Sequence, residues 1–144
     1  MNLVSLKESD NDLVVSWESQ CFGIPWTKEQ VAFEFMSNPF FVGYQALENQ
    51  DVVGYVIVWK TYEQAQISRI GILPKYQGKG LGKKMLECIK EQCWKMGCTS
   101  INLEVRSKNW AGIALYESCG FTHIHTVKDY YPDGSDAYVY EYKK

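Results

Sequence analysis

The 144-residue sequence lacks a long hydrophobic run and the signals of a secreted protein. Its longest apolar stretch, residues 52–59, is far shorter than the roughly 20 residues that a membrane-spanning helix requires. The acidic residues Glu8 and Asp10 lie where a signal peptide would have a long apolar core. We therefore expect a cytoplasmic protein that neither crosses nor binds a membrane.

Disulfide and metal patterns are also missing, and there is no strong excess of charge of either sign. The five cysteines are an odd number with no C-x-x-C pair, which is typical of reduced thiols and of neither a disulfide framework nor a zinc site. Fifteen Lys and Arg residues against 17 Asp and Glu give a net charge of −2, so we expect no nucleic-acid binding through bulk charge.

The composition that is present indicates a folded globular chain. Apolar residues make up 46% and charged residues 22% of the sequence, and no Pro-, Gly- or Ser-rich linker or internal repeat divides it. We therefore expect residues 1–144 to form a single domain. Aromatic residues, at 15%, are numerous enough to line a large cleft.

Periodicity and capping signals predict an α/β protein with a central mixed sheet. Thr27 and Gln30 have the spacing of a capping box, and Gly97 and Gly120 lie where helix-ending glycines belong. The predicted helices are residues 9–20, 27–37, 81–96 and 109–118. The predicted strands are residues 40–47, 52–59, 64–73, 101–106, 123–128 and 137–142.

The third predicted strand changes its apolar phase partway along. Ala65 and Ile67 occupy odd positions, whereas Ile70 and Ile72 occupy even ones. Because side chains of a strand alternate between two faces, one extra residue is needed to bring all four to the same face. The pattern predicts a β-bulge near residues 68–71, with backbone amides aimed away from the sheet.

A glycine-rich turn, residues 77–84, joins that strand to the next helix. It is not a Walker loop, which needs Gly in place of Gln77 and Ser or Thr in place of Lys84, nor a dinucleotide fingerprint, which needs Gly or Ala in place of Lys83. Small residues, free amides at a helix start and nearby lysines nevertheless suit a phosphate group. The alternative is a turn that only begins an amphipathic helix.

The pattern Gln77-x-x-Gly80-x-Gly82 resembles the Q/R-x-x-G-x-G/A signature of the GNAT family of acetyl-CoA-dependent N-acetyltransferases. Further segments are similar to the branch that acetylates the N-terminal alanine of a ribosomal protein: Pro25-Trp26, Ile70-Gly-Ile72, Leu103-Glu-Val-Arg106, Asn109, residues 113–121 and Asp129-Tyr-Tyr-Pro132. The resemblance covers most of the chain and is weakest between residues 37 and 65. It implies the GNAT fold, in which a mostly antiparallel sheet flanked by about four helices has a V-shaped split between two parallel strands.

Carried over by position, the resemblance implies a role for particular residues. Acetyl-CoA, as co-substrate, would be held by strand amides, by a turn around its pyrophosphate and by an asparagine near its pantetheine arm. The strand residues are Ile70, Gly71 and Ile72; the turn is Gln77, Gly78, Lys79, Gly80, Leu81, Gly82 and Lys83; the asparagine is Asn109. Glu104 would be the general base and Tyr116 the general acid, with no metal.

These roles agree with the chemistry of direct attack by an amine on a thioester. An N-terminal amine has a pKa of about 7.7–8.0, so a carboxylate such as Glu104 needs to remove only a weakly held proton. The departing coenzyme A thiolate resembles cysteine, with a pKa of about 8.5, and a tyrosine hydroxyl can protonate it. Backbone amides at the bulge would stabilise charge on the thioester oxygen.

Simpler interpretations exist for each of these residues. Glu104 lies on the polar face of a strand, Tyr116 could be a packed helix aromatic, and Asn109 could only cap a helix. His123 and His125 share a strand face, but no third ligand has suitable spacing for a metal.

Two further tyrosines, and two residues that differ from the GNAT family pattern, affect the expected shape of the cleft. Tyr130 and Tyr131, beside a turn, could border a peptide-binding groove. Trp110 and Gly112 depart from the family pattern on the cofactor side.

The resemblance therefore predicts an enzyme that acetylates the N-terminal alanine of a ribosomal protein. The alternatives are a GNAT enzyme for a small amine or a lysine side chain, and a non-catalytic acyl-CoA sensor. The sensor is disfavoured because it needs neither Glu104 nor Tyr116. The sequence does not determine the oligomeric state.

Overall fold

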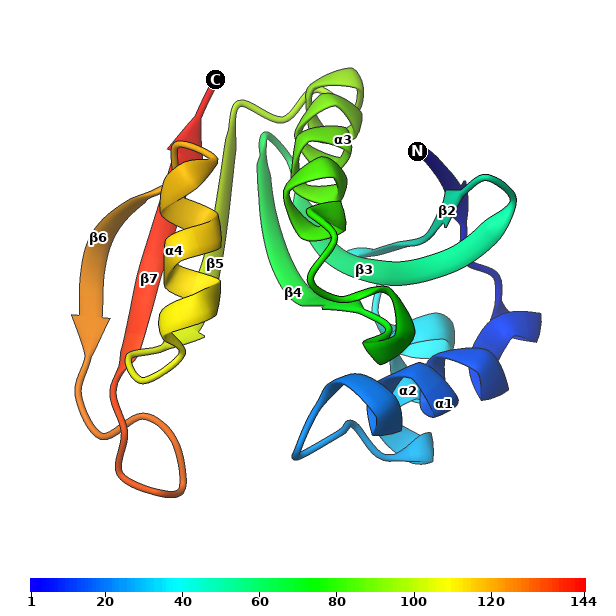
Figure 1. Ribbon diagram of the computed structural model, residues 1–144, viewed down its shortest axis with the longest axis horizontal. Coiled ribbons are helices and arrows are strands. Elements are labelled where there is room, and N and C mark those ends of the chain that lie inside the picture. Colours follow the sequence, from blue (N-terminus) through cyan, green and yellow to red (C-terminus); the bar gives the residue numbers. More distant parts are fainter.

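The computed structural model describes residues 1–144 and contains one seven-stranded sheet in the order β1-β2-β3-β4-β5-β7-β6 (Figure 1). Neighbouring strands are antiparallel except β4 and β5, which are parallel. The strands are β1 (Asn2–Ser5), β2 (Phe41–Glu48), β3 (Asp51–Thr61), β4 (Gln64–Ile72), β5 (Ser100–Arg106), β6 (Thr122–Val127) and β7 (Ala137–Lys143). The predicted mixed, mostly antiparallel sheet is thus confirmed.

Four α-helices and two short 3-10 turns accompany the sheet. The α-helices are α1 (Asn11–Cys21), α2 (Lys28–Ser37), α3 (Leu81–Lys95) and α4 (Trp110–Ser118), and the 3-10 turns are η1 (Glu8–Asp10) and η2 (Pro74–Tyr76). None of the helices is both long enough and apolar enough to cross a membrane.

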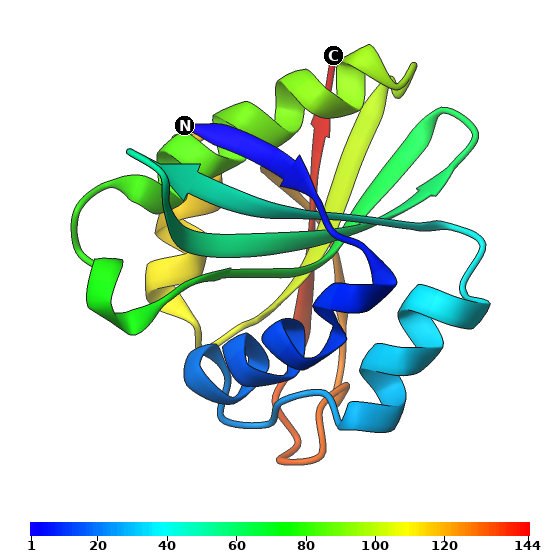
Figure 2. The ribbon, with the colours of Figure 1, turned by 90° about the vertical axis from the view of Figure 1, so that its right-hand side faces the viewer.

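The two faces of the sheet are covered by different helices (Figure 2). Alternate residues of the central strand β3 show this: Tyr55 and Ile57 pack with α1 and α2, whereas Val56 and Val58 pack with α3 and α4. β3 is therefore buried on both sides, which explains its almost uninterrupted apolar sequence.

The predicted helix ends are confirmed. Thr27 Oγ1 accepts a hydrogen bond from the Gln30 amide (3.1 Å), and Gln30 Oε1 accepts one from the Thr27 amide (2.7 Å). Gly97 (φ 88°) and Gly120 (φ 87°) follow α3 and α4 in the left-handed conformation that favours glycine.

Strand β1 was not predicted from the sequence. It pairs with β2 at the edge of the sheet, and only Leu3 among its four residues is half-buried. So short a strand with one facing apolar residue shows no alternation, which is the signal that identified the other strands.

The predicted bulge is confirmed, and it lies at Ser68. Ile57 of β3 pairs with Arg69, whereas the next residue, Val58, pairs with Ile67, so Ser68 is the extra residue. The parallel pairing of β4 with β5 ends at the same place, at Ile67. Beyond it the two strands separate (Figure 1), which is the V-shaped split that the sequence predicted.

The close approach of β3 and β4 at Gly54 and Gly71 can be tested by mutation. A Cβ at Gly54 would lie 2.4 Å from the backbone oxygen of Gly71, so Gly54→Ala should displace one strand and destabilise the protein by about 1–3 kcal/mol, lowering Tm by several degrees. Gly23→Ala is the control, because its Cβ meets nothing within 4 Å. Equal melting temperatures in thermal denaturation would contradict the contact.

Candidate active site

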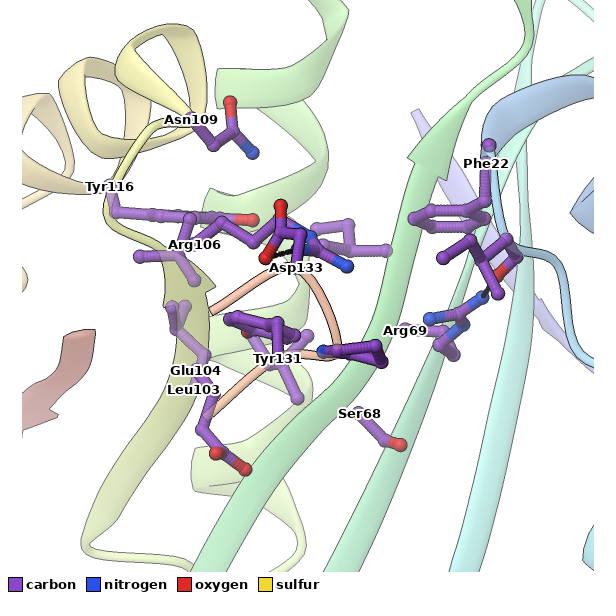
Figure 3. Close-up of a pocket in the computed structure, with 16 residues that line it drawn as sticks. Phe22, Ser68, Arg69, Leu103, Glu104, Arg106, Asn109, Tyr116, Tyr131 and Asp133 are labelled. Carbon is purple, nitrogen blue, oxygen red and sulfur yellow. Dashed lines mark hydrogen bonds and ion pairs between the residues drawn. The ribbon is translucent and has the colours of Figure 1, made fainter. Parts of the chain in front are cut away.

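A cleft opens where β4 and β5 separate (Figure 3). Its volume of about 660 Å³ lies within the usual range for sites that bind small molecules. Five parts of the chain contribute to its walls: β4, β5, the start and middle of α4, the loop after α1 and the loop between β6 and β7. The lining residues are Phe22, Gly23, Ile24, Ile67, Ser68, Arg69, Ile70, Leu103, Glu104, Val105, Arg106, Asn109, Tyr116, Tyr131, Pro132 and Asp133.

Glu104 enters the cleft from the polar side of β5. Its neighbours Leu103 and Val105 are buried in the core beneath α3 and α4, so alternation turns Glu104 to the opposite face. The side chain is half-buried, and Gln66 Nε2 lies 3.4 Å from its Oε1. Strand geometry therefore presents a carboxylate at the open edge of the split.

Two tyrosines of the loop between β6 and β7 gather at this carboxylate. A hydrogen bond to Glu104 and its negative charge raise the pKa of Tyr130. Burial, followed by the charge of Glu104, raises the pKa of Tyr131. Tyr131 lines the cleft, whereas Tyr130 is not among the lining residues, and a peptide-binding role for either stays a prediction.

Tyr116 reaches the cleft from α4 (Figure 3). Its side chain is buried, and its ring packs edge-on against Phe121 with 6.2 Å between centroids. Burial, with a smaller contribution from Tyr131, raises the pKa of Tyr116 to about 12. The phenol is therefore protonated at neutral pH and can donate a proton. The structure thus brings Glu104 and Tyr116 to one cavity.

Asn109 both caps α4 and lines the cleft. Its Oδ1 accepts a hydrogen bond from the Gly112 amide at 3.0 Å, as the sequence predicted for a helix cap. A Cβ at Gly112 would lie 2.7 Å from Asn109 Nδ2, so the glycine leaves room for the capping side chain. Trp110 is 79% exposed on the first turn of the same helix.

The glycine turn does not line this cleft but adjoins it at the start of α3. Gly78 (φ 75°) and Gly80 (φ 76°) adopt left-handed backbone conformations, and Gln77 Nε2 donates to the carbonyl oxygen of Ile72 (2.9 Å). A Cβ at Gly82 would lie 3.2 Å from Leu115, so this glycine brings α3 close to α4.

The turn has the properties of an anion site. The first intrahelical hydrogen bond of α3 runs from the Lys84 amide to the Gly80 oxygen, so the amides of residues 81–83 have no acceptor within the helix. Lys79 and Lys83 are exposed and form no ion pair, whereas Lys84 bonds Glu48 at 2.8 Å. Two of the three lysines are therefore available to an anion.

Two arginines of the cleft were not singled out by the sequence. Arg106, on β5, lies 3.9 Å from the centre of the Tyr131 ring and bonds Asp133 (3.3 Å) and Ser135 (3.2 Å). It therefore holds the loop between β6 and β7.

Arg69, on β4, makes a similar set of contacts with the opposite wall. It bonds both carboxylate oxygens of Glu18, a fully buried residue of α1. The available signal was the position of Glu18, a charge beside Val14 and Trp17 on the buried face of its helix.

The His123 ring has partners within the protein. His123 Nε2 lies 2.9 Å from both the His125 oxygen and Thr126 Oγ1, and its ring packs on Tyr138. The structure contains no cluster of three His, Cys, Asp or Glu side chains placed to hold a metal ion. Cys93 and Cys98 are buried free thiols, and Cys88 is half-buried.

Comparison with known proteins identifies the family. Residues 11–121 match the model of the acetyltransferase (GNAT) family. The ribosomal protein bS18-alanine N-acetyltransferase of Escherichia coli strain K12 is 31% identical over 92% of this chain and 88% of its own, and that of Haemophilus influenzae is 32% identical over 94% and 91%.

The fold agrees with that assignment. The crystal structure of the ribosomal-protein-S18-alanine N-acetyltransferase from Escherichia coli superimposes with a TM-score of 0.89 at 30% identity, over 99% of this chain and 92% of the other. The split sheet, the family match and these relatives lead to one conclusion: the chain belongs to the GNAT family of acetyltransferases.

Proposed function

We propose that this acetyltransferase transfers the acetyl group of acetyl-CoA to the N-terminal alanine of a ribosomal protein of the bS18 type. The observation that carries the proposal is the placement of Glu104 and Tyr116 in the cavity between β4 and β5. The names of relatives that match over nine-tenths of the chain support the acceptor. A ribosomal acceptor would place the reaction in the cytoplasm, and the proposal treats residues 1–144 as one catalytic domain.

The donor would lie on the side of α3 and α4. The free amides at the start of α3 and the side chains of Lys79 and Lys83 suit a pyrophosphate, because they supply hydrogen bonds and positive charge at the same point. Asn109 Nδ2 and the unpaired edge of β4 at residues 70–72 suit the amide-containing pantetheine arm and the acetyl carbonyl. Gln77 holds the turn on the end of β4.

The acceptor amine would enter from the opposite side of the split, beside Glu104. Its nitrogen attacks the thioester carbon and forms the amide bond while the carbon–sulfur bond breaks. Glu104 takes the proton that the nitrogen loses, directly or through water, and Tyr116 gives its proton to the departing sulfur. The Tyr116 pKa of about 12 keeps the phenol protonated at neutral pH, so it is a hydrogen-bond donor for the departing sulfur.

The acceptor assignment is tested with synthetic peptides and acetyl-CoA, measured by thiol release and mass spectrometry. A peptide that begins with alanine in the bS18 sequence should be acetylated on its α-amine, and the same peptide with a blocked N-terminus should not react. Preference for spermidine or for a lysine side chain would replace the proposed acceptor. Acetyl-CoA binding without turnover on any of them would indicate a sensor.

The base role of Glu104 is tested with Glu104→Gln, which keeps the shape but cannot take a proton. We expect kcat at pH 7 to fall about 100-fold or more, with the Kd of acetyl-CoA nearly unchanged in calorimetry. Glu91→Gln is the matched control, because Glu91 is exposed on α3 and forms no ion pair. Unchanged turnover would remove Glu104 from this role.

The phosphate role of the turn is tested with Gly80→Ala. The substitution forces alanine into a left-handed backbone (φ 76°), so the turn should shift and the Kd of acetyl-CoA should rise about tenfold. Gly97→Ala introduces the same strain (φ 88°) after the other end of α3, again with nothing within 4 Å of the new Cβ. If both variants bind acetyl-CoA equally, the turn does not hold the donor.

A further inference from the structure

The loop between α1 and α2, residues 22–27, forms one wall of the cleft through Phe22, Gly23 and Ile24 (Figure 3). It contains no helix or strand. Residues 23–26 form two hydrogen bonds: the Trp26 amide donates to Glu18 Oε1 at 2.7 Å, and Ile24 oxygen accepts from Arg69 Nη2 at 3.4 Å. Both hydrogen bonds of residues 23–26 are therefore made with either Glu18 or Arg69.

Aromatic contacts add to these hydrogen bonds. The guanidinium carbon of Arg69 lies 4.0 Å from the centre of the Phe22 ring and 4.9 Å from that of the Trp26 ring. Both ends of the loop thus pack on one cation. A planar guanidinium stacks on aromatic rings and binds a carboxylate through two donors at once, which a lysine ammonium does not do.

Arg69 can make these contacts because the bulge at Ser68 sets the face of the sheet from which it projects. Ile67, before the bulge, belongs to the core beneath α3 and α4, whereas Arg69 pairs with Ile57, which packs with α1 and α2. If Ser68 were paired as a regular strand residue and did not bulge, strict alternation would place Arg69 on the same face as Ile67, away from Glu18. The bulge at the end of the β4–β5 pairing therefore also places Arg69 on the face of the sheet where the loop of residues 22–27 lies.

Glu18 is fixed independently of the loop. Tyr55 of β3, also fully buried, donates its hydroxyl proton to Glu18 Oε2. Burial and the Glu18 charge raise the pKa of Tyr55, which stays a hydrogen-bond donor. The carboxylate is thus anchored to the sheet, and Arg69 extends that anchor to the loop.

We propose that Arg69, paired with Glu18, is a positioning residue for the acceptor: it sets the position of the Phe22–Ile24 wall against which the acceptor's first residue lies. The inference rests on the proposed function, because it assumes that the acceptor occupies this side of the split. Arg69 takes no part in proton transfer. Its effect is on how the acceptor binds and is oriented, with the donor site left intact.

The test uses Arg69→Lys, which keeps the charge but loses the stacking and the two-donor bond. With a bS18-type alanine peptide, KM should rise about tenfold, and kcat/KM should fall about 10- to 100-fold if the wall shifts by about 1 Å. The Kd of acetyl-CoA should stay within about twofold. Hydrogen exchange of residues 22–27, including the Trp26 amide, should become faster.

Three further variants separate positioning from stability. Glu18→Leu with Arg69→Met replaces the buried pair by apolar side chains, so the fold should be retained without the Arg69–Glu18 pair, which we call the clamp. This double variant should show the same rise in KM as Arg69→Lys. Ile89→Ala removes packing from the core beneath α3 and α4, which contains neither Glu18 nor the loop, so it should lower Tm and leave KM unchanged. Glu141→Gln with Lys143→Gln removes an ion pair of β7 outside the cleft and is the control for the loss of one charge of each sign.

Unchanged KM and unchanged loop exchange in folded Arg69→Lys and in the double variant would overturn the proposal. A rise in KM for Ile89→Ala equal to that for Arg69→Lys would also overturn it, because the effect would then follow stability. Should the wild type prefer spermidine or a lysine peptide, the proposed function fails, and the same variants assayed with that amine still decide whether the clamp positions the acceptor.

Discussion

The extra residue at Ser68 is the constraint on which the rest of the site depends. It lies where the parallel pairing of β4 with β5 stops, and it leaves the facing edges of both strands without a partner. An unpaired strand edge inside a protein is unfavourable unless something else satisfies its backbone groups. Under the proposed function the substrates would do so, and the same bulge turns Arg69 towards α1.

The loops that line the cleft are held in place by side chains of the central sheet. Loops form two of its walls, and each loop is held by an arginine from a central strand: Arg69 with Glu18 on one side, and Arg106 with Asp133 on the other. Stacking on Phe22 and on Tyr131 adds apolar contact to the ion pairs. The positions of the two loops are thus fixed by side chains of β4 and β5.

Much of this arrangement could be predicted from the sequence because the signals were local. The capping box at Thr27 and the phase change around Ser68 each depend on a few neighbouring residues. The edge strand β1 and the Glu18–Arg69 pair could not be predicted in the same way: the first is too short to alternate, and the second joins residues 51 positions apart. The roles of Glu104 and Tyr116 remain predictions that kinetics must decide.

The two arginine clamps share no residue, and this separation has an evolutionary consequence. Arg69 contacts only the wall after α1, and Arg106 contacts only the wall before β7. Either wall can therefore accumulate substitutions while the other, and the glycine turn, keep their shape. Under the proposed function, descendants of such a chain could change their acceptor in small steps while they still bound acetyl-CoA.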